Sequence, residues 1–488
     1  MANQALVVDD RVAQLPEFDR VIRLLPPCST VDVREGVDAL HELVNARLST
    51  GCETFVVVND ASTLPYSFHD SSNCAVLPPG SRASRLPAVL ARARSDCRLI
   101  GSAMSWRRLA DLASSEMLNF LPQLAGKHRP GQSLCYTPVM CQSDLLLPRD
   151  QPVDALLHKA TDGLEDVDSL GCALWDDHFS GIVRFAEQSS IPTVEPLSSV
   201  MRVATRTEMC CALAEASEQC KHELEVPTWR RVIAHEPSSM FNEVMNINMR
   251  APFIVKPELA CGAGWAHRML LVLRPSLLMT SDFDGLGSSA IVQRFVNHSG
   301  MLHKAYKLGG GLVTVSKHSL PDIEEALEHW PSSAAVRFHS LKELNLPAQR
   351  LWPYNEQQNP LESHPSPQSS SSSDVEAPAI SAQSVSRAAN AVEASVGMSI
   401  FGLDIVVERE SGRQFAIDLN YFPSCKAASK QAGRDLCEYI CTRVPPSTGV
   451  TSETVLNDCK YCKSGAYIGD AAVHEEELLP DGKALAGL

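Results

Sequence analysis

Residues 401–420 are the part of this chain whose fold the sequence constrains most strongly. Two apolar stretches, "FGLDIVV" and "QFAIDLN", flank the polar stretch "ERESGR", and this pattern predicts a β-hairpin. If the turn is centred on Ser411, Asp404 lies directly across from Asp418 on the same face, whereas a slip of one residue would separate them. Asp418 and Asn420 share a face in any register, because side chains alternate along a strand.

The oxygen-bearing side chains of this hairpin predict a metal site. We expect Ile405, Ile417 and Leu419 to bury the opposite face, so the acids would sit in an otherwise apolar hairpin and need a compensating charge. A pair of Mg²⁺ ions would provide it, because hard cations take carboxylate and amide oxygens together with phosphate oxygens. The alternative is a surface hairpin whose acids are solvated.

The net charge restricts the ligands that the chain can hold. It is formally −15, which argues against nucleic-acid binding through a broad basic face. An anionic ligand must therefore be held by individual cations. The apolar fraction of 44% and the charged fraction of 21% are ordinary for a globular protein. A chain of 488 residues is longer than one hydrophobic core supports, so we expect more than one domain.

No stretch of the chain has the ~20 consecutive apolar residues of a membrane span, and the first residues do not read as a secretion signal. We therefore expect a cytoplasmic protein without membrane insertion, and a monomer by default. The 16 cysteines lie in apolar stretches, which favours reduced thiols over disulfides. Cys459 and Cys462 have metal-ligand spacing, but no second pair follows, so coincidence is a better interpretation than a zinc knuckle.

The order of the expected elements indicates an α/β protein. Near the N-terminus, "ETFVVVND" and "CRLIGSAM" read as buried strands, and "VDALHELVNARL" and "SWRRLADLAS" as amphipathic helices. Further on, "TVEPLSSVMRVATRTEMCCALAEA" reads as a turn and a helix. The segment "SAIVQRFVNHSGMLHKAYKLGGGLVTVSKHSL" predicts antiparallel strands with a turn at Gly309–Gly311.

Two predicted strands end in polar residues. In "PFIVKP", Lys256 ends an apolar strand, and the loop "CGAGWAH" follows, whose glycines let the backbone approach a ligand closely. Together with the hairpin, this lysine and loop suit a nucleoside triphosphate, although none of the three is specific alone. In "ALLHKATD", the polar residues either face a ligand crevice or follow a plain strand that leads into a helix cap, and the sequence leaves both interpretations open. These residues are His158, Lys159, Thr161 and Asp162.

Five segments occur in the order and approximate spacing of one known family. They are "HKATD", "FIVKPELACGAGWAHRM", "IVQRFVNHSGMLHKAYKLGG", "TVSKHSL" and "FGLDIVV…FAIDLNYFPS". From about residue 135 to 445 the chain resembles the inositol 1,3,4-trisphosphate 5/6-kinase (inositol-tetrakisphosphate 1-kinase) family, and its N-terminal extension is similar to that of the long plant branch. The resemblance implies an ATP-grasp fold with an additional N-terminal α/β domain.

The resemblance also sets the domain boundaries that we expect. They are an N-terminal α/β extension of unknown role over 1–132, an inositol-phosphate-binding lobe over 133–200, a central ATP-grasp lobe over 201–352, a Ser/Pro-rich disordered linker over 353–386, a C-terminal ATP-grasp lobe with the metal-binding hairpin over 387–450, and a disordered tail over 451–488.

Residue roles follow from the resemblance at matched positions only. It implies that Asp404 holds one Mg²⁺, Asp418 both ions and Asn420 the second. The implied inositol-phosphate ligands are Lys159, His267, Lys304 and Asn420. The implied ATP ligands are Arg206, Lys256, Gln293, Arg294, Phe295, Val296, Lys304, Ser319 and Ser340. Asp418, Lys256 and Lys304 are the implied catalytic residues.

The implied reaction is a direct in-line attack of a ring hydroxyl of an inositol tris- or tetrakisphosphate on the γ-phosphoryl group of ATP, of the 1,3,4-trisphosphate 5/6-kinase or 3,4,5,6-tetrakisphosphate 1-kinase type. Two phosphorylated molecules repel each other, so the site needs cations between them, and lysines, His267 and the metals would supply them. An ordinary histidine titrates near pH ~6.5, so His267 can carry a proton that strengthens phosphate binding.

The chain departs from the family in three places: the first removes a nucleotide contact, the second a substrate cation, and the third leaves the isomer preference open. Cys261-Gly262 stands where most of the family carries His-Gly. In "YTPVMCQSDLLLPRD", Arg149 is the only cation where the family has a substrate lysine, and "PSCKAAS" replaces a more glycine-rich stretch.

Two other functions have to be weighed against the kinase. An ATP-grasp ligase would share the metal hairpin, but "HKATD", His267 and Lys304 suit a phosphate-rich acceptor better. An inositol-phosphate-binding regulatory protein without turnover would have no use for both metal sites.

Overall fold

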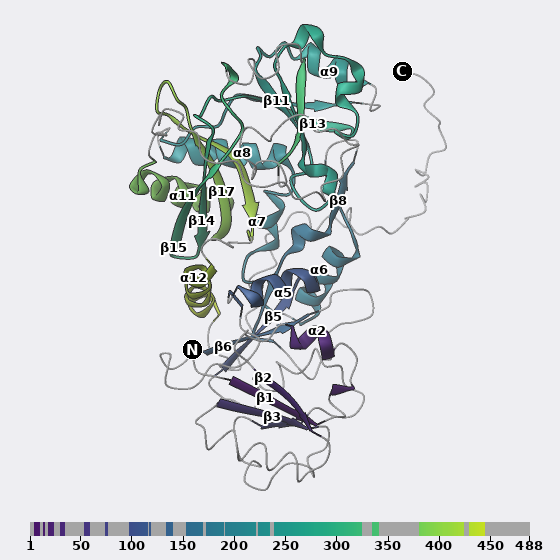
Figure 1. Ribbon diagram of the computed structural model, residues 1–488, viewed down its shortest axis with the longest axis vertical. Helices are drawn as coiled ribbons and strands as arrows, with labels where there is room; N and C mark the ends of the chain where they lie inside the picture. Colours follow the sequence, from purple (N-terminus) through teal and green to yellow (C-terminus); the bar gives the residue numbers. More distant parts are fainter. Residues whose placement is uncertain are drawn as a thin grey trace, which may run out of the picture.

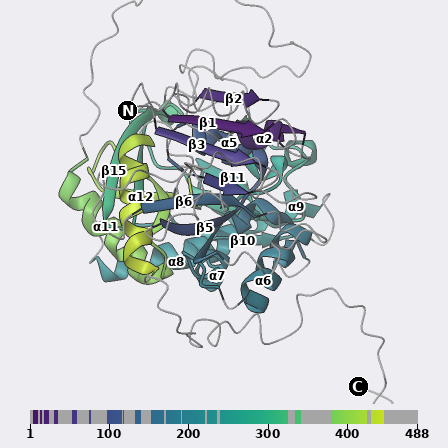
Figure 2. The ribbon, with the colours of Figure 1, turned by 90° about the horizontal axis from the view of Figure 1, so that it is seen from below.

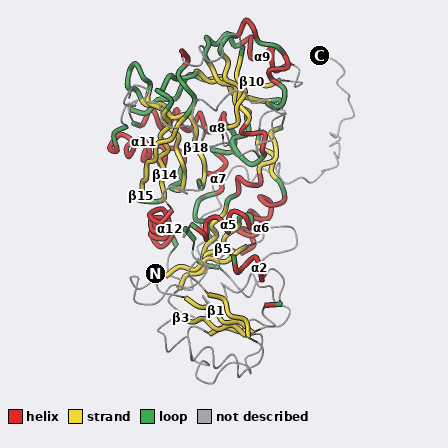
Figure 3. Tube along the Cα trace, in the orientation of Figure 1, coloured by secondary structure: helices red, strands yellow, loops and turns green. Residues whose placement is uncertain are grey.

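The computed structural model describes residues 4–9, 13–14, 18–23, 30–34, 53–58, 74–76, 97–115, 117–118, 133–139, 153–168, 172–189, 191–220, 223–234, 239–324, 334–340, 380–423 and 429–444. The predicted helix "VDALHELVNARL", Arg149, the predicted tail and its Cys459–Cys462 pair lie outside these residues. Figures 1 and 3 show that the sheets follow one another along the long axis, with the N-terminal sheet at one end. Within the described residues, none of the helices combines the length and the apolar character that crossing a membrane requires.

Four strands near the N-terminus form a parallel sheet in the order β2-β1-β3-β4. They are β1 (Gln4–Asp9), β2 (Thr30–Arg34), β3 (Glu53–Val58) and β4 (Cys74–Val76), and helix α2 (Phe18–Ile22) follows β1. The predicted strand "ETFVVV" is therefore confirmed as β3. Because parallel strands need crossover connections, this sheet agrees with the α/β extension expected from the sequence.

A second sheet has the order β6-β5-β7, with all strands parallel. It consists of β5 (Cys97–Ala103), β6 (Ser133–Pro138) and β7 (Ala155–His158), and α5 (Trp106–Ser114) follows β5 as predicted. The sheet crosses the boundary that we expected between residues 132 and 133, and a boundary before Cys97 agrees better with the strand pairing. After β7 the chain forms η4 (Ala160–Gly163), the hairpin β8 (Leu164–Val167) and β9 (Ala173–Trp175), and α6 (Asp177–Ser189).

The third sheet is antiparallel and has the order β10-β13-β11-β12-β16. Its strands are β10 (Trp229–Ile233), β11 (Phe253–Pro257), β12 (Arg268–Val272), β13 (Ser289–Arg294) and β16 (Ala335–His339). Helix α9 (Met240–Asn246) and the short helices η6 (Gly264–His267), η7 (Pro275–Leu277) and η8 (Thr280–Phe283) lie in the connections. Val255 and Val292 are fully buried, which anchors β11 and β13 in one apolar core.

The fourth sheet is antiparallel and has the order β15-β14-β17-β18. Its strands are β14 (Met301–Leu308), β15 (Gly311–His318), β17 (Ile400–Val407) and β18 (Gln414–Tyr421). Helices α7 (Leu197–Met201), α8 (Arg206–Gln219) and α11 (Ala382–Val396) belong to the core on one side of this sheet. Helix α12 (Ser429–Arg443) packs against β14 and β15, and Figure 2 shows it beside β15. Every residue of β17 is buried, because the helices cover one of its faces and other strands face the second.

Two expected boundaries disagree with this pairing. Strands β14 and β15 were expected in the central lobe, but they complete the sheet of β17 and β18. The helix α11 begins at Ala382, so residues 382–386 are helical, and the predicted disordered linker is wrong for them. Residues 353–379 of that linker lie outside the described part of the chain.

The hairpin of β17 and β18 places Asp404 opposite Asp418 as predicted, but it does so through a β-bulge. Next to the turn Ile405 pairs with Ala416, whereas Asp404 pairs with Asp418, so Ile417 is one extra residue on β18. Ile405 and Leu419 are fully buried on the helix-covered face, as expected. The expectation that Ile417 shares that face is wrong, because the bulge lets it line the same cavity as the two acids.

Candidate functional site

A cavity lies where the third and fourth sheets face each other. Lys256 of β11 and Gln293 of β13 line it from the third sheet, and Asp404 of β17 and Asp418 of β18 line it from the fourth. The other residues predicted to bind ATP that line it are Arg294, Phe295, Val296, Ser319 and Ser340. The structure therefore brings together residues that the sequence places as far apart as Lys256 and Asp418.

The walls of the cavity also contain residues that the sequence analysis did not identify. These apolar residues are Ile254, Met269, Leu302, Leu320, Phe338 and Val406. Ile254 lies two residues before Lys256, Leu302 two before Lys304 and Val406 two after Asp404, so strand alternation from the predicted ligands would have found these three. The others come from elements whose pairing the sequence does not reveal.

Each acid of the hairpin has a cation beside it. Lys304 of β14 pairs with Asp404 and donates to its carboxylate oxygens at 2.8 and 2.7 Å. Arg206 pairs with Asp418 at 3.1 Å, and the Asn420 amide donates to the same carboxylate at 2.8 Å. Two buried acids can face each other only if their charge is compensated, and these cations provide that compensation.

The pKa values of the two acids move in opposite directions. Burial raises the pKa of Asp404 above its usual range, and the charge on Asp418 adds to this effect, although Lys304 opposes it. Burial alone would raise the pKa of Asp418 as well, but Arg206 and Lys256 bring it below its usual range. Asp418 is therefore held as a carboxylate by cations from two different segments of the chain.

Lys256 projects from β11 onto the bulge of the hairpin. The residue is 4% exposed, and its Nζ donates to the carbonyl oxygen of Ile417 at 2.9 Å. Burial lowers the pKa of Lys256 to about 8, and Arg206 lowers it further, while Asp418 opposes the shift. The bulge thus has a consequence for the site, because the extra residue supplies the acceptor that orients this lysine.

Arg206 begins helix α8 and is only 1% exposed. Its guanidinium also donates to the carbonyl oxygen of Ala266 at 3.3 Å, which ties the helix to the loop after β11. Glu258, which is fully buried, accepts from the backbone and the hydroxyl of Thr207, both at 3.0 Å. Glu258 was not predicted to belong to the site, although an acid two residues after the strand lysine, within an apolar segment, is the signal that could have revealed it.

The residues at the end of β7 separate into two groups. His158 is fully buried, with Nε2 3.1 Å from the carbonyl oxygen of Glu195 and Nδ1 accepting from the backbone of Ala160, so its position is structural. Asp162 forms an ion pair with Arg108 at 2.9 Å. For His158 and Asp162, these contacts support the interpretation of a plain strand end rather than of a ligand crevice.

Lys159 directs its ammonium group at the hairpin that carries the two acids. Its Nζ donates to the carbonyl oxygen of Tyr421, directly beside Asn420, and lies 5.3 Å from the centre of the Tyr421 ring. Burial lowers the pKa of Lys159 to about 8, and Arg108 adds to the shift. The lysine from the second sheet is therefore next to the hairpin of the fourth.

His267 ends η6 on the side of the site where Arg206 contacts Ala266. Its Nδ1 is 3.4 Å from the hydroxyl of Ser340, and the Ser340 backbone donates to its carbonyl oxygen at 3.0 Å. Burial lowers the pKa of His267 to about 4, with further lowering by Arg206, so the ring is neutral at neutral pH. Without bound phosphates the ring therefore does not carry the proton that was expected, because burial, together with the nearby Arg206 guanidinium, disfavours the charged form.

The hairpin offers a donor set that suits Mg²⁺. Asp404, Asp418 and Asn420 provide only oxygen ligands on one face of the hairpin, and both acids are largely buried. Among the residues that the structure describes, no group of at least 3 His, Cys, Asp or Glu side chains could hold a metal by itself. Mg²⁺ is usually held by one or two carboxylates together with substrate phosphates, so this smaller set fits a metal that arrives with a nucleotide.

The model of the ATP-grasp domain of inositol 1,3,4-trisphosphate 5/6-kinases matches residues 218–442. This range includes β10 to β18 and the whole cavity lining. The fold and the site therefore define an ATP-grasp protein. More particularly, residues 218–442 are similar to the ATP-grasp domain of the inositol 1,3,4-trisphosphate 5/6-kinase family, the family that the motifs predicted.

Curated relatives are named as inositol-tetrakisphosphate 1-kinases. Inositol-tetrakisphosphate 1-kinase 6 of Oryza sativa subsp. indica is 26% identical over 288 residues, which are 57% of this chain and 48% of the relative. Inositol-tetrakisphosphate 1-kinase 5 of Oryza sativa subsp. japonica is 25% identical over 64% of this chain and 82% of its own length. Inositol-tetrakisphosphate 1-kinase 1 of Arabidopsis thaliana is 24% identical over 56% and 82%. The chain thus spans about half the length of the first of these relatives, the rice inositol-tetrakisphosphate 1-kinase 6.

Similarity to solved structures is weaker. The D-cycloserine synthetase DcsG aligns over 72% of this chain and 99% of its own, with a TM-score of 0.40 and 12% identity. The fold assignment rests on the family match rather than on this alignment.

Proposed function

We propose that this protein is an inositol polyphosphate kinase that transfers the γ-phosphoryl group of ATP to a ring hydroxyl of an inositol tris- or tetrakisphosphate. The observation that carries the proposal is that Lys159, Arg206 and Lys256 all contact the hairpin that bears Asp404 and Asp418. Lys256 and the two acids line one cavity, and this cavity lies within the segment that matches the kinase family's domain. The relatives named as inositol-tetrakisphosphate 1-kinases support the same substrate class.

In this proposal the nucleotide occupies the cavity between the two sheets. Its base lies against the apolar walls, and its phosphates lie toward Lys256 and the acids. Lys256 is suited to a phosphate because it is almost fully buried and its ammonium group already points at the hairpin. Arg206 would steady Asp418 and add positive charge near the γ-phosphate.

Asp404, Asp418 and Asn420 would hold Mg²⁺, which would neutralise charge on the phosphates of the bound nucleotide. Lys304 currently uses two of its three N–H groups on Asp404. We propose that Lys304 turns part of its donor capacity toward an acceptor phosphate when both ligands are bound, so that the Asp404 carboxylate becomes available.

The acceptor would bind on the side where Lys159 and His267 lie. Both are close to the hairpin, since Lys159 contacts Tyr421 and the pKa of His267 is affected by Arg206 and Asp418. Catalysis would come mainly from holding the hydroxyl in line with the γ-phosphorus and from charge stabilisation.

The test is Mg²⁺-dependent transfer of radiolabelled phosphate from ATP to a panel of inositol tris- and tetrakisphosphates. We expect transfer to at least one isomer, and a loss of about a thousandfold or more in Asp418→Ala, because the metal-binding carboxylate is removed. Glu410→Ala, which removes an exposed acid from the turn of the same hairpin, is the matched control and should retain full activity. Binding of both ligands without transfer by the folded wild-type protein would favour the regulatory alternative.

A further inference from the structure

Glu258 is a buried acid near the site that has no role in the proposal above. It follows Lys256 by two residues, is fully buried and does not line the cavity. Both of its carboxylate oxygens are nevertheless used. Oε1 accepts from the backbone amide of Thr207 and Oε2 from the Thr207 hydroxyl, each at 3.0 Å, and Nε of Arg231 lies 3.6 Å from Oε2. A buried carboxylate is costly unless its oxygens are paired in this way, so its position is closely defined.

The partner of Glu258 is the first turn of helix α8. The first four amides of a helix have no acceptor within the helix. In α8, the Arg206 amide donates to the carbonyl oxygen of Glu258 at 2.7 Å, and the Thr207 amide donates to its carboxylate. The Ala260 amide also donates to the carbonyl oxygen of Ala204 at 3.3 Å. Glu258 thus forms a junction between the start of α8 and the segment that leaves β11, and its negative charge suits the N-terminus of a helix.

Arg206 depends on this junction because its side chain has few other supports. The guanidinium contacts the Asp418 carboxylate at 3.1 Å and the Ala266 carbonyl oxygen at 3.3 Å, and its Nε has no hydrogen-bond partner among the residues that the structure describes. One turn later, the sulfur of Met209 accepts from the Leu419 amide at 3.2 Å, so the helix also packs on β18. The first turn of α8 is therefore fixed at both ends, and the guanidinium reaches Asp418 from a defined point.

The junction also holds two like charges together. Arg206 begins α8 and Lys256 belongs to β11, so the two cations come from different segments. Besides the larger effect of burial, Arg206 lowers the pKa of Lys256, which shows that the two repel each other, and Asp418 opposes this shift. Once a metal and phosphates occupy the site, Asp418 has other partners. A backbone junction with an acid at its centre keeps both cations in place in that state.

We propose that Glu258 is a positioning residue for phosphoryl transfer, which fixes the start of α8 to the end of β11 and thereby keeps the Arg206 guanidinium on Asp418 while charge moves between the phosphates. It acts through Arg206 and does not touch the ligands. A displacement of about 1 Å in such a site can cost up to about a hundredfold in rate. This inference rests on the proposed function, because it requires phosphoryl transfer in the cavity.

The experiment measures kcat and the KM for ATP in the Mg²⁺-dependent transfer assay on the full chain, with the inositol phosphate that the wild type phosphorylates fastest. We expect Glu258→Ala to lower kcat about tenfold or more. Its KM should stay within about threefold of the wild-type value, because Arg206 keeps its charge but loses its position. Glu258→Gln should recover most of the loss, since its amide oxygen can still accept from the Thr207 amide. Melting temperatures identify variants that do not fold.

A double-mutant cycle with Arg206→Ala separates positioning from general stabilisation. Single turnovers with the protein in excess over labelled ATP make slow variants measurable. If Glu258 acts through Arg206, Glu258→Ala should cost less than about twofold in the Arg206→Ala background. If Glu258→Ala does not fold, Thr207→Val takes its place in the cycle. This variant removes only the hydroxyl contact, so it should lower kcat about threefold and cost nothing further in the Arg206→Ala background.

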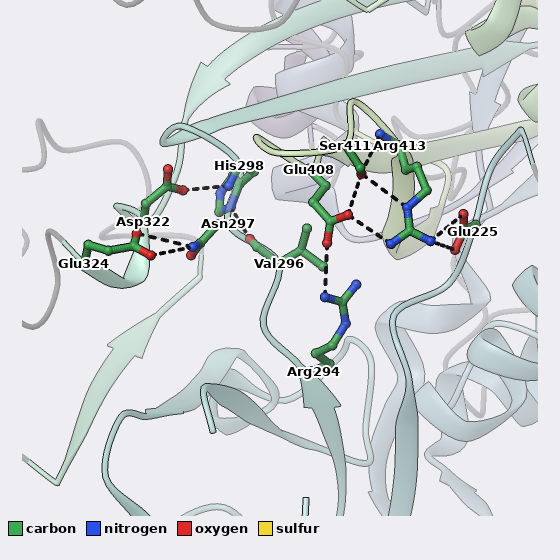
Figure 4. A network of polar contacts seen from close by, with 10 residues as sticks. All are labelled: Glu225, Arg294, Val296, Asn297, His298, Asp322, Glu324, Glu408, Ser411 and Arg413. Atoms are coloured by element: carbon green, nitrogen blue, oxygen red, sulfur yellow. Dashed lines mark hydrogen bonds and ion pairs between the residues drawn. The ribbon is translucent and has the colours of Figure 1, made fainter. Parts of the chain in front are cut away.

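The matched control is Glu225→Ala. Glu225 is also an acid paired with an arginine, because its carboxylate accepts from Arg413 at 3.2 Å (Figure 4), and its backbone is hydrogen-bonded to β18. It lies outside the cavity lining, so this variant should keep the wild-type kcat.

Three results would overturn the inference while the proposed function stands. They are a folded Glu258→Ala with the wild-type kcat, a Glu258→Gln that is as slow as Glu258→Ala, and equal losses in both backgrounds of the cycle, whether Glu258→Ala or Thr207→Val is used. No transfer by the wild-type protein to any inositol phosphate would instead overturn the proposed function, and this inference with it.

Discussion

Single residues in this site have charge states that depend on neighbours from distant segments. Asp404 and Asp418 face each other, yet burial raises the pKa of the former while Arg206 and Lys256 lower that of the latter. The same Arg206 helps burial to keep His267 neutral. A turn centred on Ser411 was enough to predict that the two acids face each other. The neutral state of His267, in contrast, depends on its burial and on Arg206 of helix α8, which no local pattern connects to it.

Lys159 provides a test of the acceptor side through pH. Burial lowers the pKa of Lys159 to about 8, so above that pH the unbound protein loses the positive charge that would hold a phosphate. The affinity for inositol phosphates should therefore fall as pH rises through this value, by up to about tenfold per pH unit. The measurement is the dissociation constant of one inositol tetrakisphosphate from neutral pH to about pH 9.5, for the wild type and for Lys159→Arg, whose guanidinium does not titrate in this range.

The control for this profile is Lys307→Arg. Lys307 is another buried lysine on β14, and its Nζ lies 3.0 Å from a carboxylate oxygen of Glu393 on helix α11. The Lys307→Arg variant should show the wild-type profile. Titration of the ligand itself affects all three proteins equally, so only a difference between them reports on Lys159. Identical profiles for wild type and Lys159→Arg would show that this lysine does not contact the ligand.

At the scale of elements, the bulge in β18 and the loop after β11 shape the site. A hairpin was predictable from the two apolar stretches around "ERESGR", and the register of the acids was predicted correctly. The bulge at Ile417 was not predictable, because the turn could be centred in more than one way and an extra residue restores the same pairing. It matters because the carbonyl of Ile417 holds Lys256.

The loop after β11 depends on one of its two glycines. Gly262 has φ of +87°, and a Cβ there would lie 2.2 Å from the carbonyl oxygen of Leu164, whereas a Cβ at Gly264 would have no atom within 4 Å. Gly262→Ala should therefore destabilise the protein by about 2 kcal/mol, and Gly264→Ala should leave stability nearly unchanged. Melting temperatures of the two variants check this, and equal values would contradict the close packing of this loop on β8.

At the scale of the whole molecule, the site depends on pairing between strands that are far apart in the sequence. Ordered motifs were enough to predict the ATP-grasp fold, which the family match over residues 218–442 confirms. They did not predict that β5 joins β6 and β7, or that β14 joins β17, because non-local pairing leaves no trace in the pattern of a single strand. The expected boundaries at residues 132 and 352 followed sequence order and therefore cut through these sheets.

The central claim is that nucleotide, metal and inositol phosphate meet at the hairpin of β17 and β18. The most direct measurement is phosphorus relaxation by Mn²⁺, which accepts the same kind of oxygen ligands as Mg²⁺, with a non-hydrolysable ATP analogue and an inositol tetrakisphosphate bound together. We expect strong relaxation of the nucleotide phosphates and of at least one inositol phosphate, with both effects lost in Asp418→Ala. Relaxation of the nucleotide alone, with the inositol phosphate bound but unaffected, would contradict the account.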